Sequence, residues 1–297
     1  MANNIQLAQR FAPFLDELYQ REALTSILEV AGDMVQYTQN AKTVLIPEMT
    51  LQGLGDYDRN NGFTRGDVVL QWTPYTLTQD RGRSFQVDRM DNEETVEIAF
   101  GRLASEFMRV HVIPEVDAYR FATMAARAAN SASGALDEST TLEAIDDAIE
   151  ILDDAEVPQE GRVLFVSSAV AKYLKQAPNY ERNKEITTRA GIDRRVDMLD
   201  GMPVIQVPRP RFYDAIDLLD GSTAGQEAGG YVPSGDPINF MIVHTGAVLA
   251  ITKHALPRVF SPDVNQDADA WKFDYRIYHD VIVPNNKTAG IFLHTAS

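Results

Sequence analysis

Cysteine is absent from the 297 residues of this chain, and lysine is scarce, with seven lysines against twenty arginines. The lack of cysteine excludes disulfides, thiolate metal sites and a cysteine nucleophile. Basic residues are too few to balance the acidic ones, and the net charge is -16. So acidic a surface repels phosphate backbones, which argues against sequence-specific nucleic-acid binding. The arginine bias indicates either contacts between chains or a lineage bias in composition.

Long hydrophobic runs are also missing. The longest uncharged apolar stretch, residues 237–252, contains Asn239 and His244 and is shorter than the roughly 18 residues that a membrane-spanning helix needs. The N-terminal segment "MANNIQLAQRFAPFLDELYQ" has no apolar core of signal-peptide length. We therefore expect a soluble protein that stays inside the cell that makes it and does not bind membranes.

Motifs for catalysis and phosphate binding are absent as well. No HExxH or GxSxG occurs, and "GLGDYD" and "GGYVPSG" match neither the dinucleotide fingerprint nor the P-loop. The histidines are scattered and read as structural or surface residues: His111, His244, His254, His279 and His294. The sequence therefore predicts no catalytic residue and no cofactor, and we expect that the protein is not an enzyme.

One segment partly matches a calcium-binding loop. Asp263, Asn265 and Asp267 occupy positions 1, 3 and 5, but Ala268 stands where glycine is required and Asp274 where a bidentate glutamate is expected. The flanking segments have strand patterns instead of helical ones. A polar β-turn is the better interpretation, and no metal site is predicted.

The patterns that are present predict an α+β fold. Residues 5–30 have loosely helical spacing, and residues 43–87 are rich in β-branched and aromatic residues, with "DRNNG" and "DRG" as turns between strands. Residues 131–250 alternate helices and strands around "RVLFV", "MPVIQVP" and "INFMIV", and the C-terminal segments alternate as strands. Thr140 and Glu143 have the spacing of a capping box, and the Gly-rich residues 221–235 are expected to be the most mobile loop.

A very long helix is predicted from about residue 91 to 130. Asp91 and Glu94 have the spacing of an acidic capping box. The apolar stripe that follows repeats at steps of four and three: Val96, Phe100, Leu103, Phe107 and Val110. We expect the helix to continue through Pro114 with a kink and to end near Asn130.

Charges concentrate where the predicted strands meet this helix, in "DRGRSFQVDRMDNEET", residues 80–95. A catalytic cluster, a solvated turn with intrachain ion pairs and a subunit contact would each place charges here. The residues of the junction do not by themselves distinguish among the three.

The order of an N-terminal segment, a long hairpin, a long helix, an α/β region and returning strands resembles the major capsid proteins of tailed phages, the Hong Kong 97-like fold. The stretches "GLGDYDRNNGF", "VVLQW" and "TLTQDRGRSFQVDRMDNEET" carry the most specific similarity. The resemblance implies an N-terminal arm (1–42), an extended β-hairpin loop (43–90), the spine helix of a peripheral domain (91–130), an axial domain (131–250) and C-terminal strands of the peripheral domain (251–297). Residues 221–235 would then lie near the capsomer pore.

The same resemblance implies a function. The chain would be the major capsid protein of a bacteriophage, forming the hexamers and pentamers of an icosahedral shell around double-stranded DNA packaged without sequence specificity. We expect it in the virion capsid, assembled in the host bacterial cytoplasm. Its partners would be copies of itself, a portal protein, a separate scaffolding protein and, as an option, a decoration protein. A separate scaffold is expected because no long segment precedes Thr43; the alternative is that the given chain is already in its mature form. The lysine-to-asparagine cross-link of the fold's founding member cannot be carried over, because no lysine lies between Lys42 and Lys172.

Charged and aromatic residues of the loop and the junction are the predicted subunit-interface residues: Asp56, Arg59, Arg65, Trp72, Arg81, Arg83, Asp88 and Arg89. The competing interpretation is that the junction charges pair within one chain at an ordinary turn. Two alternatives for the whole protein also stay open, namely an encapsulin-type cellular shell and a soluble acidic hydrolase.

Overall fold

The computed structural model describes residues 23–29, 36–37, 43–59, 62–63, 65–90, 98–176, 183–189 and 192–297. The predicted capping residues Asp91 and Glu94, and most of the predicted N-terminal arm, lie outside the described residues. Among the described residues, no helix is both long and apolar enough to cross a membrane.

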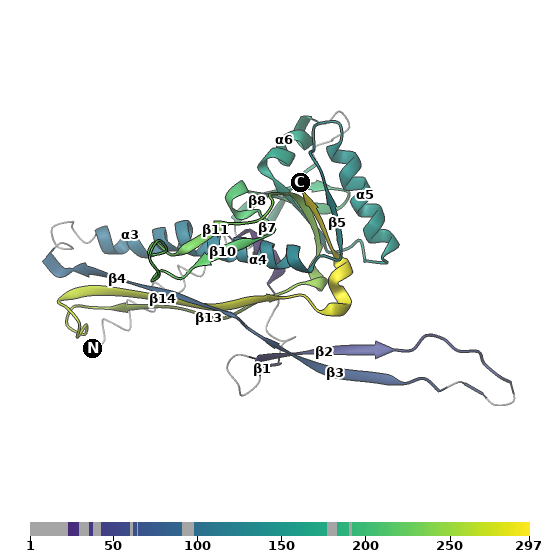
Figure 1. Ribbon diagram of the computed structural model, residues 1–297, viewed down its shortest axis with the longest axis horizontal. Coiled ribbons are helices and arrows are strands. Elements are labelled where there is room, and N and C mark those ends of the chain that lie inside the picture. Colours follow the sequence, from purple (N-terminus) through teal and green to yellow (C-terminus); the bar gives the residue numbers. More distant parts are fainter. Residues whose placement is uncertain are drawn as a thin grey trace.

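A β-hairpin projects from the body of the molecule, as the sequence predicts (Figure 1). Its two long strands pair antiparallel along their whole length, from Thr43 opposite Thr76 to Leu51 opposite Val68. The small sheet to which they belong has the order β1-β2-β3. Its strands are β1 (Gln36–Tyr37), β2 (Thr43–Leu51) and β3 (Val68–Thr76). We call residues 43–76 the projecting hairpin.

After the hairpin the chain enters a second antiparallel sheet of order β13-β14-β4. Its strands are β4 (Gln79–Asp88), β13 (Leu249–Phe260) and β14 (Ala270–Ile282). The prediction of a turn at "DRG" was wrong, because residues 80–82 lie inside β4 and the break between strands falls at Leu77 and Thr78. Gly82 serves close backbone approach instead: a Cβ there would lie 2.8 Å from the carbonyl oxygen of Tyr275.

The long helix packs on this sheet (Figure 1). It consists of α3 (Ile98–Phe107), the π-helical turn η3 (Met108–Val112) and α4 (Ile113–Arg127). Pro114 lies in the first turn of α4, and the π turn precedes it directly. This wider turn shifts the helical register, so Met108 and Val112 face the core while Val110 is 49% exposed. The predicted stripe was therefore wrong at Val110, and the helix ends three residues before Asn130, which starts a strand.

The α/β region is built on a seven-stranded mixed sheet of order β5-β15-β12-β6-β9-β8-β7. Its strands are β5 (Asn130–Ser133), β6 (Arg162–Ser167), β7 (Asn183–Arg189), β8 (Ile192–Leu199), β9 (Met202–Val207), β12 (Ile238–His244) and β15 (Ile291–Thr295). All six residues of β6 are buried. This confirms the strand predicted at "RVLFV", whose apolar run is typical of a buried strand.

Helices cover both faces of this sheet, which gives three layers. Val163 and Phe165 of β6 pack in one apolar cluster with Phe121 of α4, whereas Leu164 and Val166 pack in another with the helices α5 (Thr141–Asp154) and α6 (Ser168–Gln176). The alternation follows from the twofold period of a strand. It places α4 between the two sheets, packed against each.

The capping box predicted at Thr140 does not form. Thr140 is the N-cap residue of α5, but its side chain makes no capping bond to the helix. Its hydroxyl instead donates to Oδ1 of Asp137, which also accepts the backbone N–H groups of Ser139 and Thr140. These bonds, the Ser139 hydroxyl above all, lower the pKa of Asp137 to about 2.

Two further segments are placed by strand pairing. The C-terminal strand β15 lies in the seven-stranded sheet, between β5 and β12, and not with β13 and β14. The Gly-rich residues 221–235, expected to be a loop, include strand β11 (Gly230–Pro233), which pairs with β10 (Ile216–Leu219). This β10–β11 hairpin extends beside the long helix, away from α5 and α6 (Figure 1). The remaining short helices are η1 (Leu24–Leu28), η4 (Arg209–Arg211), η5 (Thr245–Ala247) and η6 (Asn285–Gly290).

Candidate functional site

The structure separates the predicted interface residues into two groups. Asp56, Arg59, Arg65 and Trp72 all lie on the projecting hairpin and are exposed. Asp58 and Gly62 pair as an isolated antiparallel β-bridge near the outer end of the hairpin. Beside that bridge, the rings of Tyr57 and Phe63 meet edge to face with centroids 4.8 Å apart. This first group is far from the second, which follows strand β4 (Figure 1).

Apolar side chains crowd the outer part of the projecting hairpin. Among the described residues, nine of the fourteen exposed large hydrophobic side chains lie between positions 49 and 72. They are Met49, Leu51, Leu54, Tyr57, Phe63, Val68, Val69, Leu70 and Trp72. β3 is also an edge strand of its sheet, so one row of its backbone groups has no strand partner. A long, apolar, unprotected edge is a surface that other chains cover in an assembly.

Arg81 and Arg83 extend from β4 toward the long helix and the β10–β11 hairpin, and both have partners in the same chain. Nε of Arg81 donates to Oε1 of Glu115 at 2.7 Å, and its Nη2 donates to the carbonyl oxygen of Gly230 at 3.2 Å. Arg83 donates to the carbonyl oxygens of Glu227 and Ala228 at 3.0 and 3.3 Å. These contacts match the intrachain interpretation of the junction, and contacts with a neighbouring subunit stay a prediction.

Asp88 and Arg89 stand at the end of β4. Oδ1 of Asp88 accepts the backbone N–H of Met90 at 2.9 Å. The guanidinium of Arg89 lies 3.7 Å from Asp263 and 3.8 Å from Asp269. These acidic residues belong to the loop that partly matches a calcium site, in which Asp267 pairs with Lys272 at 3.0 Å. Among the described residues, no group of acidic or histidine side chains could hold a metal ion.

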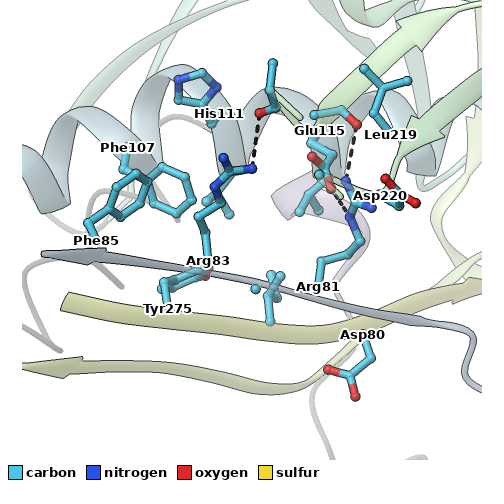
Figure 2. Close-up of a pocket in the computed structure, with 18 residues that line it drawn as sticks. Asp80, Arg81, Arg83, Phe85, Phe107, His111, Glu115, Leu219, Asp220 and Tyr275 are labelled. Atoms are coloured by element: carbon cyan, nitrogen blue, oxygen red, sulfur yellow. Dashed lines mark hydrogen bonds and ion pairs between the residues drawn. The ribbon is translucent and has the colours of Figure 1, made fainter. Parts of the chain in front are cut away.

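A pocket of about 300 Å³ lies between β4, the long helix and the β10–β11 hairpin (Figure 2). One end is aromatic, with Phe85, Phe107 and Tyr275 in edge-to-face contacts. The other end is polar, where Arg81 and Glu115 neutralise each other. The ion pair in the pocket is formed within the chain, and Arg81 and Arg83 also donate to backbone carbonyl oxygens of residues 227–230. We therefore describe the pocket as the contact between β4 and the β10–β11 hairpin.

Sequence patterns did not reveal a buried polar network at the helix. Both oxygens of Asp117 are used, since Oδ1 accepts from the backbone N–H and hydroxyl of Thr25 and Oδ2 from Leu24 and Arg211. Burial raises the pKa of Asp117, while the bonds from Thr25 and Leu24 act in the opposite direction. Arg120, one turn further on and also buried, donates to Thr25 and Glu29. The sequence signal that could have indicated this network is the presence of two charged residues, Asp117 and Arg120, among the apolar residues of the predicted helix.

A second polar group joins the base of the projecting hairpin to the body. Oδ2 of Asp280 accepts the backbone N–H and the hydroxyl of Thr78 at 2.7 and 3.0 Å, and Oδ1 accepts the hydroxyl of Tyr119 at 2.8 Å. Next to it, His279 is buried, with its ring edge on to Tyr119 at a centroid distance of 5.6 Å. Burial is the main cause that lowers the pKa of His279 to about 3, which keeps the ring neutral.

A scan against protein-family models finds no match, and a search of curated proteins finds none either. Solved structures do match, over most of the chain. A protein of Gordonia phage Cozz superposes with a TM-score of 0.61 at 10% identity, covering 93% of this chain and 86% of that one. The capsid protein of cyanophage P-SCSP1u matches with a TM-score of 0.56 at 10% identity, covering 88% of this chain and 85% of that one. The protein of the mature capsid of bacteriophage PhiM1 matches with a TM-score of 0.54 at 12% identity, covering 88% of this chain and 83% of that one.

These matches show the fold. The chain has the α+β architecture of tailed-phage capsid proteins, the Hong Kong 97-like fold, and the fold class expected from the sequence is confirmed.

Proposed function

We propose that this chain is the major capsid protein of a tailed bacteriophage and that it self-assembles into the hexamers and pentamers of an icosahedral shell around double-stranded DNA. Its role is structural, without a catalytic site or a cofactor. In the virion its partners would be copies of itself and a portal protein, with a separate scaffolding protein during assembly in the host cytoplasm and a decoration protein as an option.

One observation carries the proposal beyond the fold, namely the apolar surface of the projecting hairpin. The side chains of Phe63, Val68 and Leu54 are 87%, 66% and fully exposed, on a hairpin that stands away from the body (Figure 1). Among the described residues of a single subunit, none covers these side chains, and apolar area exposed to water favours association. A shell, in which each hairpin lies on a neighbour, covers every copy.

The test is assembly. We expect the purified chain, expressed together with its scaffolding protein, to form capsomers or closed shells in negative-stain images and in light scattering. Shells filled with a protein cargo would favour the alternative of an encapsulin-type cellular shell. A chain that stays monomeric in the presence of its scaffolding protein would contradict the proposal.

A matched pair of variants locates the surface. Leu70→Asp places a charge on the hairpin and should leave a folded subunit that fails to assemble. Ile151→Asp places the same charge on helix α5, at a side chain that is also partly exposed, and should assemble normally. Equal effects of the two substitutions would mean that the hairpin is not the assembly surface.

A further inference from the structure

The direction of the projecting hairpin is decided at two residues. β3 ends at Thr76 in one sheet and β4 begins at Gln79 in another, so the chain changes sheets at Leu77 and Thr78. Because most described side chains of the outer hairpin are exposed, the contacts at its base are the described contacts that can set the angle at which it leaves the body.

Several contacts meet at this base. Leu77 is buried in a small apolar cluster with residues that begin β2, and its carbonyl oxygen accepts the hydroxyl of Tyr278 at 3.0 Å. Such a cluster resists separation, but apolar contacts have little directional preference. Besides the bond from Tyr278, the directional contacts described here are the bonds from Thr78 and Tyr119 to Asp280, a residue that is only 6% exposed.

The carboxylate of Asp280 joins three separate elements. It belongs to β14, and besides the two bonds from Thr78 and the one from Tyr119 of α4 it accepts its neighbour Val281's backbone N–H at 2.8 Å. Hydrogen bonds to an ionised acceptor are shorter and stronger than neutral ones. The two oxygens of Asp280 therefore fix Thr78, which lies between β3 and β4, relative to both the β13-β14-β4 sheet and the long helix.

The length of the hairpin makes this angle matter. At about 3.3 Å per residue, the run from Thr43 to Asp58 spans about 50 Å. A rotation of about 10° at the base would then move the outer end by about 9 Å, which is more than twice an apolar contact distance of about 4 Å. Loosening at Thr78 would be enough to separate the hairpin from a docking surface.

We propose that Asp280 is a positioning residue for assembly, which fixes the exit angle of the projecting hairpin by holding Thr78 and Tyr119. This inference rests on the proposed function for its consequence, whereas the geometric part can be tested in the unassembled subunit.

The direction of the hairpin can be measured as a distance between two spin labels. Because the chain has no cysteine, the labels attach only at introduced cysteines. Leu54→Cys on the hairpin and Glu150→Cys on α5 would carry two spin labels at exposed sites. In the full-length, unassembled chain we expect a narrow distribution of label-to-label distances. Adding Asp280→Ala should widen that distribution at least twofold and lower the shell yield at least tenfold at equal subunit concentration.

Two control substitutions separate positioning from general stability. Ser84→Ala removes another hydroxyl-to-carboxylate bond to strand β14, the one from Ser84 to Asp274, and should leave the distance distribution and shell yield unchanged. Val166→Ala weakens the core of the other sheet and should lower the melting temperature without widening the distribution. If Asp280→Ala does not fold, Thr78→Val carries the test, with Thr78→Ser, which keeps the hydroxyl, expected to behave as the unsubstituted chain.

An unchanged distance distribution in Asp280→Ala, or in Thr78→Val where the former does not fold, would overturn the inference. So would equal widening by Val166→Ala. If the chain without substitutions forms no shells, the proposed function is contradicted instead. The distance distribution in the unassembled subunit would still test whether Asp280 positions the hairpin.

Discussion

The hydroxyl of Thr25 donates a hydrogen bond of 2.7 Å to the carboxylate of Asp117, a residue 92 positions later in the chain. Both side chains are buried, and the backbone of Thr25 donates to the same oxygen. The segment before the projecting hairpin is thus attached to the long helix through a polar contact that water does not reach. Such contacts are costly to break, because each group left behind is buried without its partner.

Asp117→Ala should therefore destabilise the subunit strongly. The substitution leaves the amides of Leu24 and Thr25 without an acceptor and the guanidinium of Arg211 without its carboxylate. We expect a loss of about 3 kcal/mol in the free energy of unfolding, measured by chemical denaturation. Glu106→Ala, which removes an exposed pair with Arg109, should cost at most about 0.5 kcal/mol. Similar losses in the two variants would contradict the role of the buried network.

Arg81→Glu should destabilise the attachment of the long helix to β4, because it places a second carboxylate beside Glu115. Both side chains of the pair keep some contact with water, at 23% and 15% exposure, so screening limits the expected loss to about 1 to 2 kcal/mol. Combining it with Glu115→Arg restores opposite charges and should recover most of the melting temperature. Arg83→Glu, whose partners are backbone carbonyls, should not be rescued by Glu115→Arg.

The same exchange of charges tests the predicted interface role of Arg81. If the residue acts only inside the subunit, the doubly substituted chain should regain assembly together with stability, as sedimentation would show. Recovered stability without recovered shells would instead assign Arg81 to a contact between subunits.

Gly82→Ala should be poorly tolerated, because the new Cβ would lie 2.8 Å from the carbonyl oxygen of Tyr275, in a strand that is paired along its length. Overpacking of this kind typically costs about 1 to 3 kcal/mol. Gly53→Ala is the matched control, since no atom lies within 4 Å of the position of its Cβ. Thermal unfolding of the two variants compares them directly, and equal melting temperatures would rule out a close approach at Gly82.

The buried His279 predicts a loss of stability on mild acidification. Its pKa is about 3 in the folded chain against 6.5 when exposed, so the unfolded chain binds a proton first as the pH falls. Its contribution is fully present above pH 6.5 and is lost progressively below it, by about 2 kcal/mol between pH 7 and 5. His279→Gln should flatten that part of the pH profile of unfolding free energy, whereas His254→Gln, at an exposed site, should leave it unchanged. A profile of the same steepness in both variants would refute the assignment.

Mature particles should contain no covalent links from the projecting hairpin. The projecting hairpin, residues 43–76, includes no lysine, so it offers no side-chain amine for an isopeptide bond. After denaturation the subunit should migrate as a single band near 33.1 kDa in gel electrophoresis. A ladder of multimers would show that another cross-linking chemistry operates.

Local patterns were enough to predict the order of elements. β-branched and aromatic residues predicted the strands of the hairpin, and the apolar run "RVLFV" predicted the buried strand β6. Apolar periodicity predicted the long helix, because propensity and side-chain period act over a few neighbouring residues. The quoted stretches around residues 53–95 carried the resemblance to phage capsid proteins, and the fold confirms it. The charged stretch at residues 80–95 begins inside strand β4, which ends at Asp88, and its residues 91–95 lie outside the described part of the chain.

Only the tertiary structure decided which distant residues meet. "DRG" has the composition of a turn, yet the pairing of β4 with β14 holds it in a strand, since ladder bonds outweigh local turn preference. The π turn before Pro114 moved Val110 out of the core, and β15 joined the seven-stranded sheet instead of β14. The partners of Arg81, Asp117 and Asp280 lie 34 to 202 positions away. No local pattern encodes such distances, because burial of apolar surface brings these groups together and hydrogen bonding then selects among them.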